Sequence, residues 1–208
     1  MGVADNKKIV RALLDRAGRT YAEQAGIELA DKPAPLYRLL VLSVLLSTRI
    51  RANIAVDAAR ELGKDFGTPR KMLDATWQQR VDALGRAHYV RYDESTATAL
   101  GDGAELLLDK YGGDLRKIRG DDLGKRLREV PRLGPVGVDI FCREAQDVWP
   151  ELRPYLDNKA LDGARKVGLP TTPKTLAGLV PAAQVPRLAA ALIRASLDKE
   201  IAAAVCAA

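Results

Sequence analysis

Asp157 is a carboxylate that stands directly before an expected helix, so its backbone would be held at the end of a rigid element. A carboxylate fixed in this way can stabilise positive charge that develops during a reaction, or take a proton from an attacking water. Asp is also a common helix N-cap, so a purely structural role is the alternative. The two roles are compatible, because a cap position orients the side chain.

A Pro/Gly-rich turn lies upstream of Asp157, within residues 130–141. Apolar residues recur at helical spacing on both sides of the turn, which predicts two helices joined by a hairpin. Gly134 and Gly137 lie where the chain must turn sharply, and glycine lets backbone N–H groups approach a ligand. Those groups would lie at the start of the second helix, where free donors and the helix dipole favour an anion such as phosphate. An ordinary helix-helix connection is the alternative.

The composition indicates a soluble globular protein of one domain or two small lobes: 208 residues, 47% hydrophobic and 29% charged. The net charge of +6 favours an anionic partner. Two cysteines, Cys142 and Cys206, are too few for a disulfide framework or a four-cysteine metal site, which makes the cytoplasm the default location. We expect no secretory signal and no membrane span, because residues 1–8 lack an apolar core and the longest apolar run, 39–46, is short.

The spacing of apolar residues predicts an all-α fold without strands. The helix expected over 36–46 is apolar on nearly all sides, so it should be buried. Ser47 or Thr48 is expected to cap the next helix, and Gly63 to end it. The other helices are expected over 7–16, 21–30, 51–62, 74–84, 91–111, 158–167 and 181–205, and Asp157 is expected to cap the helix at 158–167. Thr68 and Pro69 are expected to open a further short helix. In the helix over 181–205, the residues expected to face inward are Leu188, Leu192, Leu197 and Ile201.

The order of helix, Gly-rich hairpin, helix, loop and single aspartate resembles the helix-hairpin-helix DNA glycosylases, the superfamily of endonuclease III. The resemblance covers roughly residues 35–170 and is strongest at the hairpin and at Asp157. It implies a fold of two helical lobes, with 36–130 in one, the helix-hairpin-helix at 121–148, and 1–35 packing with 149–208 in the other. It also implies that Asp157 is the catalytic carboxylate.

The resemblance assigns further residues to DNA binding. Arg49 stands where endonuclease III fills the gap left by the nucleotide that is flipped out of the duplex, although a surface arginine after a helix is the alternative. The other expected DNA contacts are Arg51, Arg132, Gly134, Val136, Gly137 and Lys159. The base pocket is expected to involve Ser47, Tyr92, Asp93 and Glu94, where Tyr92 can stack on a base and the two acids can read its edge. A solvated helix start is the alternative for 92–94.

Three positions depart from the family pattern. Val136 replaces the lysine that attacks the sugar in bifunctional members, and valine is not a nucleophile. Ser43 replaces the additional acid of the adenine glycosylases. Arg132 replaces the first hairpin glycine, which makes the turn less permissive but offers a guanidinium to phosphate. The region after Asp157 contains only Cys206, so we expect no iron–sulfur cluster and no other cofactor or metal.

The sequence therefore predicts a monofunctional DNA glycosylase of base-excision repair, acting on double-stranded DNA as a monomer in the cytoplasm, or at the nucleoid in a bacterium. Asp157→Asn is expected to abolish base release with little change in stability, because Asn can still cap the helix. Two alternatives stay open. One is a non-catalytic DNA-binding protein with the same hairpin, and the other is an abasic-site lyase that uses a displaced lysine, with Lys159 the nearest candidate.

Overall fold

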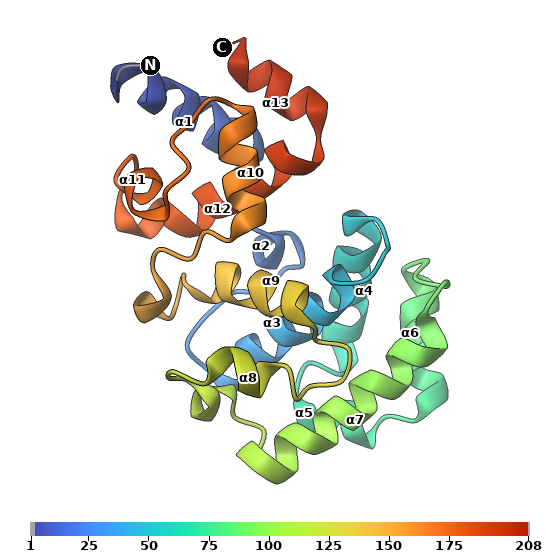
Figure 1. The fold of residues 1–208 in the computed structure, drawn as a ribbon. Coiled ribbons are helices and arrows are strands. Elements are labelled where there is room, and N and C mark those ends of the chain that lie inside the picture. The colour runs from blue at the N-terminus through green and yellow to red at the C-terminus, as the bar shows by residue number, and fades with distance from the viewer. Residues whose placement is uncertain (1–2, 208) are drawn as a thin grey trace. The chain divides into compact units, whose positions relative to one another are not determined.

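The computed structural model describes residues 3–207, and these residues form helices and loops without a strand, which confirms the predicted all-α class (Figure 1). Met1, Gly2 and Ala208, which belong to the expected lobe of the two chain ends, lie outside the described residues. The chain divides into two compact units. We call residues 3–21 and 142–207 the terminal unit and residues 22–141 the central unit.

The central unit is built around a buried helix, α3. Leu36, Leu39, Leu42 and Leu45 are fully buried, which confirms the predicted burial. Helix α3 packs against α4, and α7 packs against α5 and α6. The elements are α2 (Tyr21–Gln24) at the boundary, α3 (Pro33–Leu46), α4 (Ala52–Asp65), α5 (Pro69–Asp74), α6 (Trp77–Arg86), α7 (Asp93–Tyr111), the 3-10 helix η1 (Leu115–Ile118), α8 (Leu123–Leu127) and the start of α9 (Pro135–Ala145).

The terminal unit is built around α12, which packs against α1, α10 and α13 (Figure 1). Its apolar stripe is buried, with Leu188 and Leu192 fully inside. The elements are α1 (Val3–Ala17), the end of α9, the 3-10 helix η2 (Pro150–Leu152), α10 (Asn158–Lys166), α11 (Pro173–Ala177), the 3-10 helix η3 (Ala182–Gln184), α12 (Val185–Leu197) and α13 (Lys199–Cys206). None of the helices in the described part of the chain is both long and apolar enough to cross a bilayer.

Gly163 lets α10 approach α12 closely. A Cβ at this position would lie 1.9 Å from the backbone oxygen of Leu192, far inside van der Waals contact. We expect Gly163→Ala to lower the free energy of unfolding by about 1–3 kcal/mol or more, because the two helices must move apart. Gly85→Ala in α6 is the matched control, since a Cβ there meets nothing within 4 Å. Urea unfolding should rank the variants in this order, and equal stabilities would show that α10 and α12 do not pack as described.

Several helix ends were predicted correctly from local sequence. The Thr68 side chain accepts a hydrogen bond from the Lys71 N–H at the start of α5, which confirms the predicted cap. Gly112 ends α7 in the left-handed region, with φ 63°, a conformation that favours glycine. Asp157 caps α10 by accepting from the Ala160 N–H at 3.2 Å.

Other predicted helix ends were wrong, among them those of α2 and α4. Helix α2 stops at Gln24 instead of reaching residue 30, because Gly26 takes φ 67° and the Ile27 N–H closes the turn on Ala22. Helix α4 continues through Gly63 to Asp65. Its N-cap is Arg51, without a side-chain cap.

Ser47 and Thr48, which we expected to cap α4, end α3 instead. Their hydroxyl groups donate to the carbonyl oxygens of Val44 and Leu45 at 2.8 and 2.7 Å. Helix α4 begins at Ala52 with Arg51 at the N-cap position, so neither Ser47 nor Thr48 stands where a side-chain cap is needed. The two hydroxyls therefore fix the chain as it leaves the buried helix.

The single helix expected over 181–205 is broken. Asp198 ends α12 and caps α13, accepting from the N–H groups of Glu200 and Ile201. The break changes the direction of the apolar stripe, and Leu197, expected to face inward, is 62% exposed. Ile201 is half-buried.

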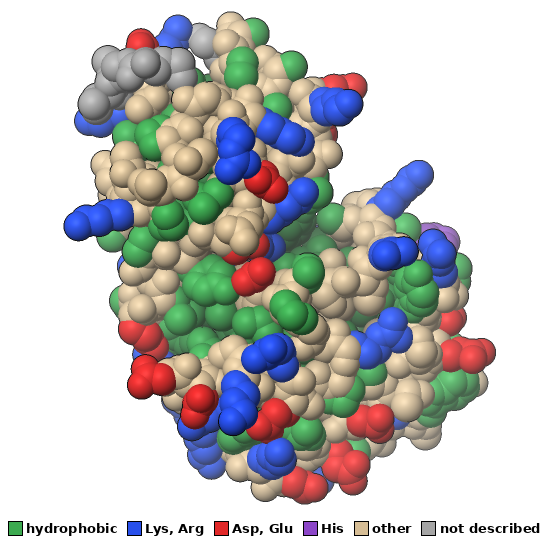
Figure 2. Space-filling view, viewed as in Figure 1, with side chains coloured by type: hydrophobic (Ala, Val, Ile, Leu, Met, Phe, Trp, Pro, Cys, Tyr) green, Lys and Arg blue, Asp and Glu red, His purple; other side chains and the backbone are tan. Residues whose placement is uncertain are grey.

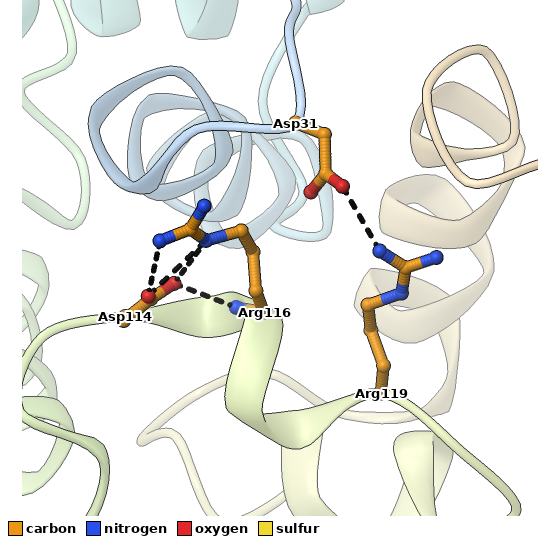
Figure 3. A network of polar contacts seen from close by, with 4 residues as sticks. All are labelled: Asp31, Asp114, Arg116 and Arg119. Atoms are coloured by element: carbon orange, nitrogen blue, oxygen red, sulfur yellow. Dashed lines mark hydrogen bonds and ion pairs between the residues drawn. The ribbon is translucent and has the colours of Figure 1, made fainter.

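Ion pairs hold the connection between α7 and α8 (Figure 3). Asp114 caps η1 by accepting from the Arg116 N–H and pairs with its guanidinium at 2.7 Å. The hydrogen bond from Arg116 lowers the pKa of the Asp114 carboxyl. Arg119 pairs with Asp31, which precedes α3, at 3.0 Å. These contacts tie the segment before α8 to the buried helix.

Candidate functional site

Two anchors hold the Asp157 carboxylate within the terminal unit. Oδ1 accepts from the Ala160 N–H at 3.2 Å, and Oδ2 accepts from Nη1 of Arg143, near the end of α9, at 2.6 Å. The Arg143 and Asp157 side chains are only 10% and 9% exposed. Asp157 is therefore half of an almost buried ion pair, which the sequence had not indicated.

The loop that carries Asp157 is fastened to the end of α9. Gln146 is fully buried, and its amide donates to the Tyr155 carbonyl oxygen at 3.0 Å while accepting from the Tyr155 N–H at 2.9 Å. The same amide donates to the Arg143 carbonyl oxygen at 2.9 Å. The guanidinium of Arg153 donates to the backbone carbonyl oxygen of Gln146 at 2.6 Å. Arg143, Gln146 and Arg153 thus form a polar clamp that sets the position of Asp157.

The anchored carboxylate keeps the capacity for chemistry. A carboxylate offers about four lone-pair sites, and Ala160 and Arg143 each use one. The remaining sites can accept a proton from a water or face a developing positive charge. Lys159, expected to bind DNA, lies two positions further along the first turn of α10 and is exposed.

The hairpin between α8 and α9 lies in the central unit, and its turn differs from the expected one. The residue with φ in the left-handed region is Arg132, at 64°, not a glycine. A Cβ on Gly134 would meet nothing within 4 Å, so neither the turn nor packing requires glycine there. Gly137 is a packing residue, because a Cβ would lie 2.6 Å from Leu133. The expectation that Gly134 and Gly137 make the sharp turn was wrong.

The start of α9 presents the backbone donors that the sequence predicted. The Val138 N–H donates to the Gly134 carbonyl oxygen at 3.1 Å, which begins the helical hydrogen-bond series. The N–H groups of Val136 and Gly137 precede it, where a helix offers no acceptor of its own. Val136 is 61% exposed, so this end of the helix faces solvent. The arrangement suits an anion.

Arg132 joins the hairpin to the start of α7. Its Nη1 donates to the Ser95 hydroxyl at 2.5 Å, and its guanidinium lies over the Tyr92 ring at 5.7 Å from the centroid. The guanidinium of Arg91 lies over the same ring at 5.2 Å. Two cation–π contacts therefore engage Tyr92 and compete with the base stacking expected of it. They also bring two positive charges together at this point.

The acids after Tyr92 serve the start of α7. The Asp93 carboxylate accepts from the Glu94 N–H at 2.8 Å, and Glu94 itself is exposed. Acidic side chains in a first turn interact favourably with the helix dipole. Their geometry thus matches the structural alternative, and a role in reading a base stays a prediction.

The loops around Ser47, Tyr89 and the hairpin are connected within the central unit. The Thr48 and Tyr89 hydroxyls share a hydrogen bond of 2.9 Å, and the place of a Cβ on Gly137 lies 3.5 Å from the Ser47 Cβ. We call eight exposed residues of these segments the loop face; they are Arg49, Arg51, His88, Val90, Arg91, Arg132, Gly134 and Val136.

Four of the residues on the loop face are arginines, and Val90 is 65% exposed. Val90 was not predicted as a site residue, because an exposed valine has no signal in the local sequence pattern. On the side of the molecule seen in Figure 2, Lys and Arg side chains are spread among acidic ones. Val90 directly precedes Arg91, so an exposed apolar side chain accompanies the arginines of the loop face.

Cys142 is buried and Cys206 is exposed, and neither forms a disulfide bond. Within residues 3–207, no group of three or more His, Cys, Asp or Glu side chains is arranged to hold a metal ion.

Solved structures with a similar fold include two complexes of endonuclease III with DNA. One is a trapped covalent intermediate, an estranged-adenine complex, and the other is a non-covalent complex. Each matches with a TM-score of 0.52 and 14% sequence identity, covering 90% of this chain and 84% of the other. This chain therefore shares the helical fold of endonuclease III, as the resemblance predicted. Neither protein-family models nor curated proteins give a sequence match.

Proposed function

We propose that this protein is a monofunctional DNA glycosylase, which hydrolyses the bond between a damaged or mismatched base and deoxyribose. The observation that carries the proposal is the anchored carboxylate of Asp157 at the start of α10, in a chain that shares the fold of endonuclease III. Asp157 faces the positive charge that builds on the sugar as the base leaves. Water then bonds to the sugar carbon, Asp157 takes one of its protons, and the departed base is protonated from solvent.

The loop face supports DNA as the substrate. Backbone N–H groups at the start of α9 and the side chains of Arg49, Arg51 and Arg91 suit phosphate oxygens. We propose that Val90 enters the base stack and that Arg49 fills the gap left by the extruded nucleotide. The proposal includes no iron–sulfur cluster, since Cys206 is the single cysteine after Asp157.

One observation favours the alternative of a non-catalytic DNA-binding protein. The guanidinium of Arg143 opposes the charge of Asp157 at 2.6 Å, as in a purely structural ion pair. Such a protein would bind duplex DNA without releasing a base. A panel of duplexes, each with one lesion or mismatch and scored for free base by mass spectrometry, separates the two functions.

A substitution at Gly134 tests whether the hairpin binds the phosphate backbone of DNA. We expect Gly134→Val to keep the fold, because its side chain enters open space, yet to screen the donors at the start of α9. Binding to undamaged duplex should weaken about tenfold, since a hydrogen bond to a charged group contributes about 1.5–3 kcal/mol. The salt dependence should stay the same, because no charge is removed.

Fluorescence anisotropy with a labelled duplex measures both quantities. Gly85→Val is the control, as its side chain also enters open space but in α6. Gly137→Ala is unsuitable, because a Cβ collides with Leu133 and would disturb folding and binding together. Normal binding by Gly134→Val would show that the hairpin does not contact the phosphate backbone.

A further inference from the structure

We infer that Arg143 is a positioning residue, which holds the Asp157 carboxylate in the orientation that base release requires. The inference rests on the proposed function and assigns a role to a residue on α9 that belongs neither to the hairpin turn nor to the loop of Asp157. The two residues are 14 positions apart in sequence, and the structure joins them through a 2.6 Å ion pair.

The geometry shows why one anchor is insufficient. The Ala160 N–H fixes Oδ1 of Asp157 at the start of α10, but the carboxylate plane can still rotate about that contact. The bond from Arg143 to Oδ2 removes this freedom and defines where the unused lone pairs point. A planar guanidinium imposes direction on its partner, which a lysine ammonium does not.

Arg143 is itself held in place. Its carbonyl oxygen accepts from the Gln146 amide, which also bonds to both backbone polar groups of Tyr155. Gln146 is fully buried, so these hydrogen bonds are shielded from water. The backbone of Arg143 and the loop that leads to Asp157 are therefore joined through one side chain.

Burial distinguishes this pair from an ion pair on the surface of the same unit. Arg165 and Asp162 also meet at 2.6 Å, but their side chains are 65% and 50% exposed. Taking two charges out of water consumes much of the attraction between them, so a buried pair is weak support for stability. Restricting the carboxylate to one orientation is the function that its burial serves, because small displacements of a reacting group lower rates strongly.

The test compares Arg143→Gln, Arg143→Lys and the matched control Arg165→Gln. Single-turnover base release with enzyme in excess, duplex affinity and thermal unfolding are measured for each on a substrate of the wild-type protein. We expect Arg143→Gln to lower the release rate on the order of 10²-fold at unchanged duplex affinity. Arg143→Lys should fall between it and the wild type, and Arg165→Gln should match the wild type.

Chemical rescue with guanidinium distinguishes a positioning role of Arg143 from an effect of the substitution on folding. In folded Arg143→Ala, millimolar guanidinium should restore part of the release rate, and the same salt should have no effect on Arg165→Ala. An unchanged rate in Arg143→Gln, or a loss that only follows the unfolded fraction without rescue, would overturn the inference alone. Absence of base release by the wild-type protein would overturn the proposed function and this inference with it.

Discussion

Replacing Asp157 with asparagine should lower the rate of base release on the order of 10²–10⁴-fold and also destabilise the protein. Asn has one acceptor oxygen, so it cannot serve both the Ala160 N–H and Arg143. Arg143, only 10% exposed, would keep its charge without a counter-ion. Removing one partner of a buried pair typically costs about 3–5 kcal/mol, and we expect the lower end here. The sequence-based expectation of little change in stability did not include this partner.

A second variant keeps the test of Asp157 independent of folding. In Arg143→Gln/Asp157→Asn neither position carries a charge, so no unpaired charge is left buried, and urea unfolding should show much of the lost stability restored. Base release should stay as slow as in Asp157→Asn, because neither amide can take a proton from water. Asp162→Asn, in the exposed pair with Arg165, should change stability by about 1 kcal/mol or less. Normal base release by the double variant would remove Asp157 from the mechanism.

Introducing an amine at position 136 should let the protein form a covalent complex with DNA that borohydride traps. The side chain of Val136 is 61% exposed at the start of α9, so a lysine can be accommodated without repacking. We expect borohydride to trap no covalent complex between the wild-type protein and DNA. Val136→Lys should form one, because an amine that displaces the base at the sugar carbon yields an imine with the opened sugar, which borohydride reduces.

The control is Val136→Arg, which adds the same charge without a nucleophile at neutral pH. The wild-type product should be an intact abasic site that breaks only after alkali or heat. A trapped adduct with the wild-type protein would contradict the monofunctional proposal. Its loss in Lys159→Ala would then identify Lys159 as the displaced nucleophile.

Local rules predicted the elements whose ends depend on a few neighbouring residues. The buried helix α3 followed from an apolar run on all sides, and the cap of α10 from Asp157. The hairpin followed from apolar spacing around a Pro/Gly cluster. The residue of the hairpin that takes a positive φ could not be predicted in the same way. Arg132, not a glycine, takes the left-handed conformation, and Ser95 and Tyr92, far away in sequence, hold its side chain.

The surroundings of Asp157 could not be read from the sequence. No motif in the sequence singles out Arg143 or Gln146, yet Arg143 is almost buried and Gln146 is fully buried. Both contact a loop that returns only after residue 150, and no local pattern encodes such a return. A signal does exist in the composition of this segment, because polar residues that interrupt an apolar helix often have buried partners.

Base release at equal DNA occupancy tests the central claim most directly. The wild-type protein and the Arg143→Gln/Asp157→Asn double variant are each saturated with a duplex that carries one lesion, and free base is counted over time by mass spectrometry. We predict that the wild-type protein releases one base per duplex and leaves an intact abasic strand, whereas the double variant releases base on the order of 10²–10⁴-fold more slowly. If the wild-type protein binds every duplex of the lesion panel and releases no base from any of them, it is a DNA-binding protein and not a glycosylase.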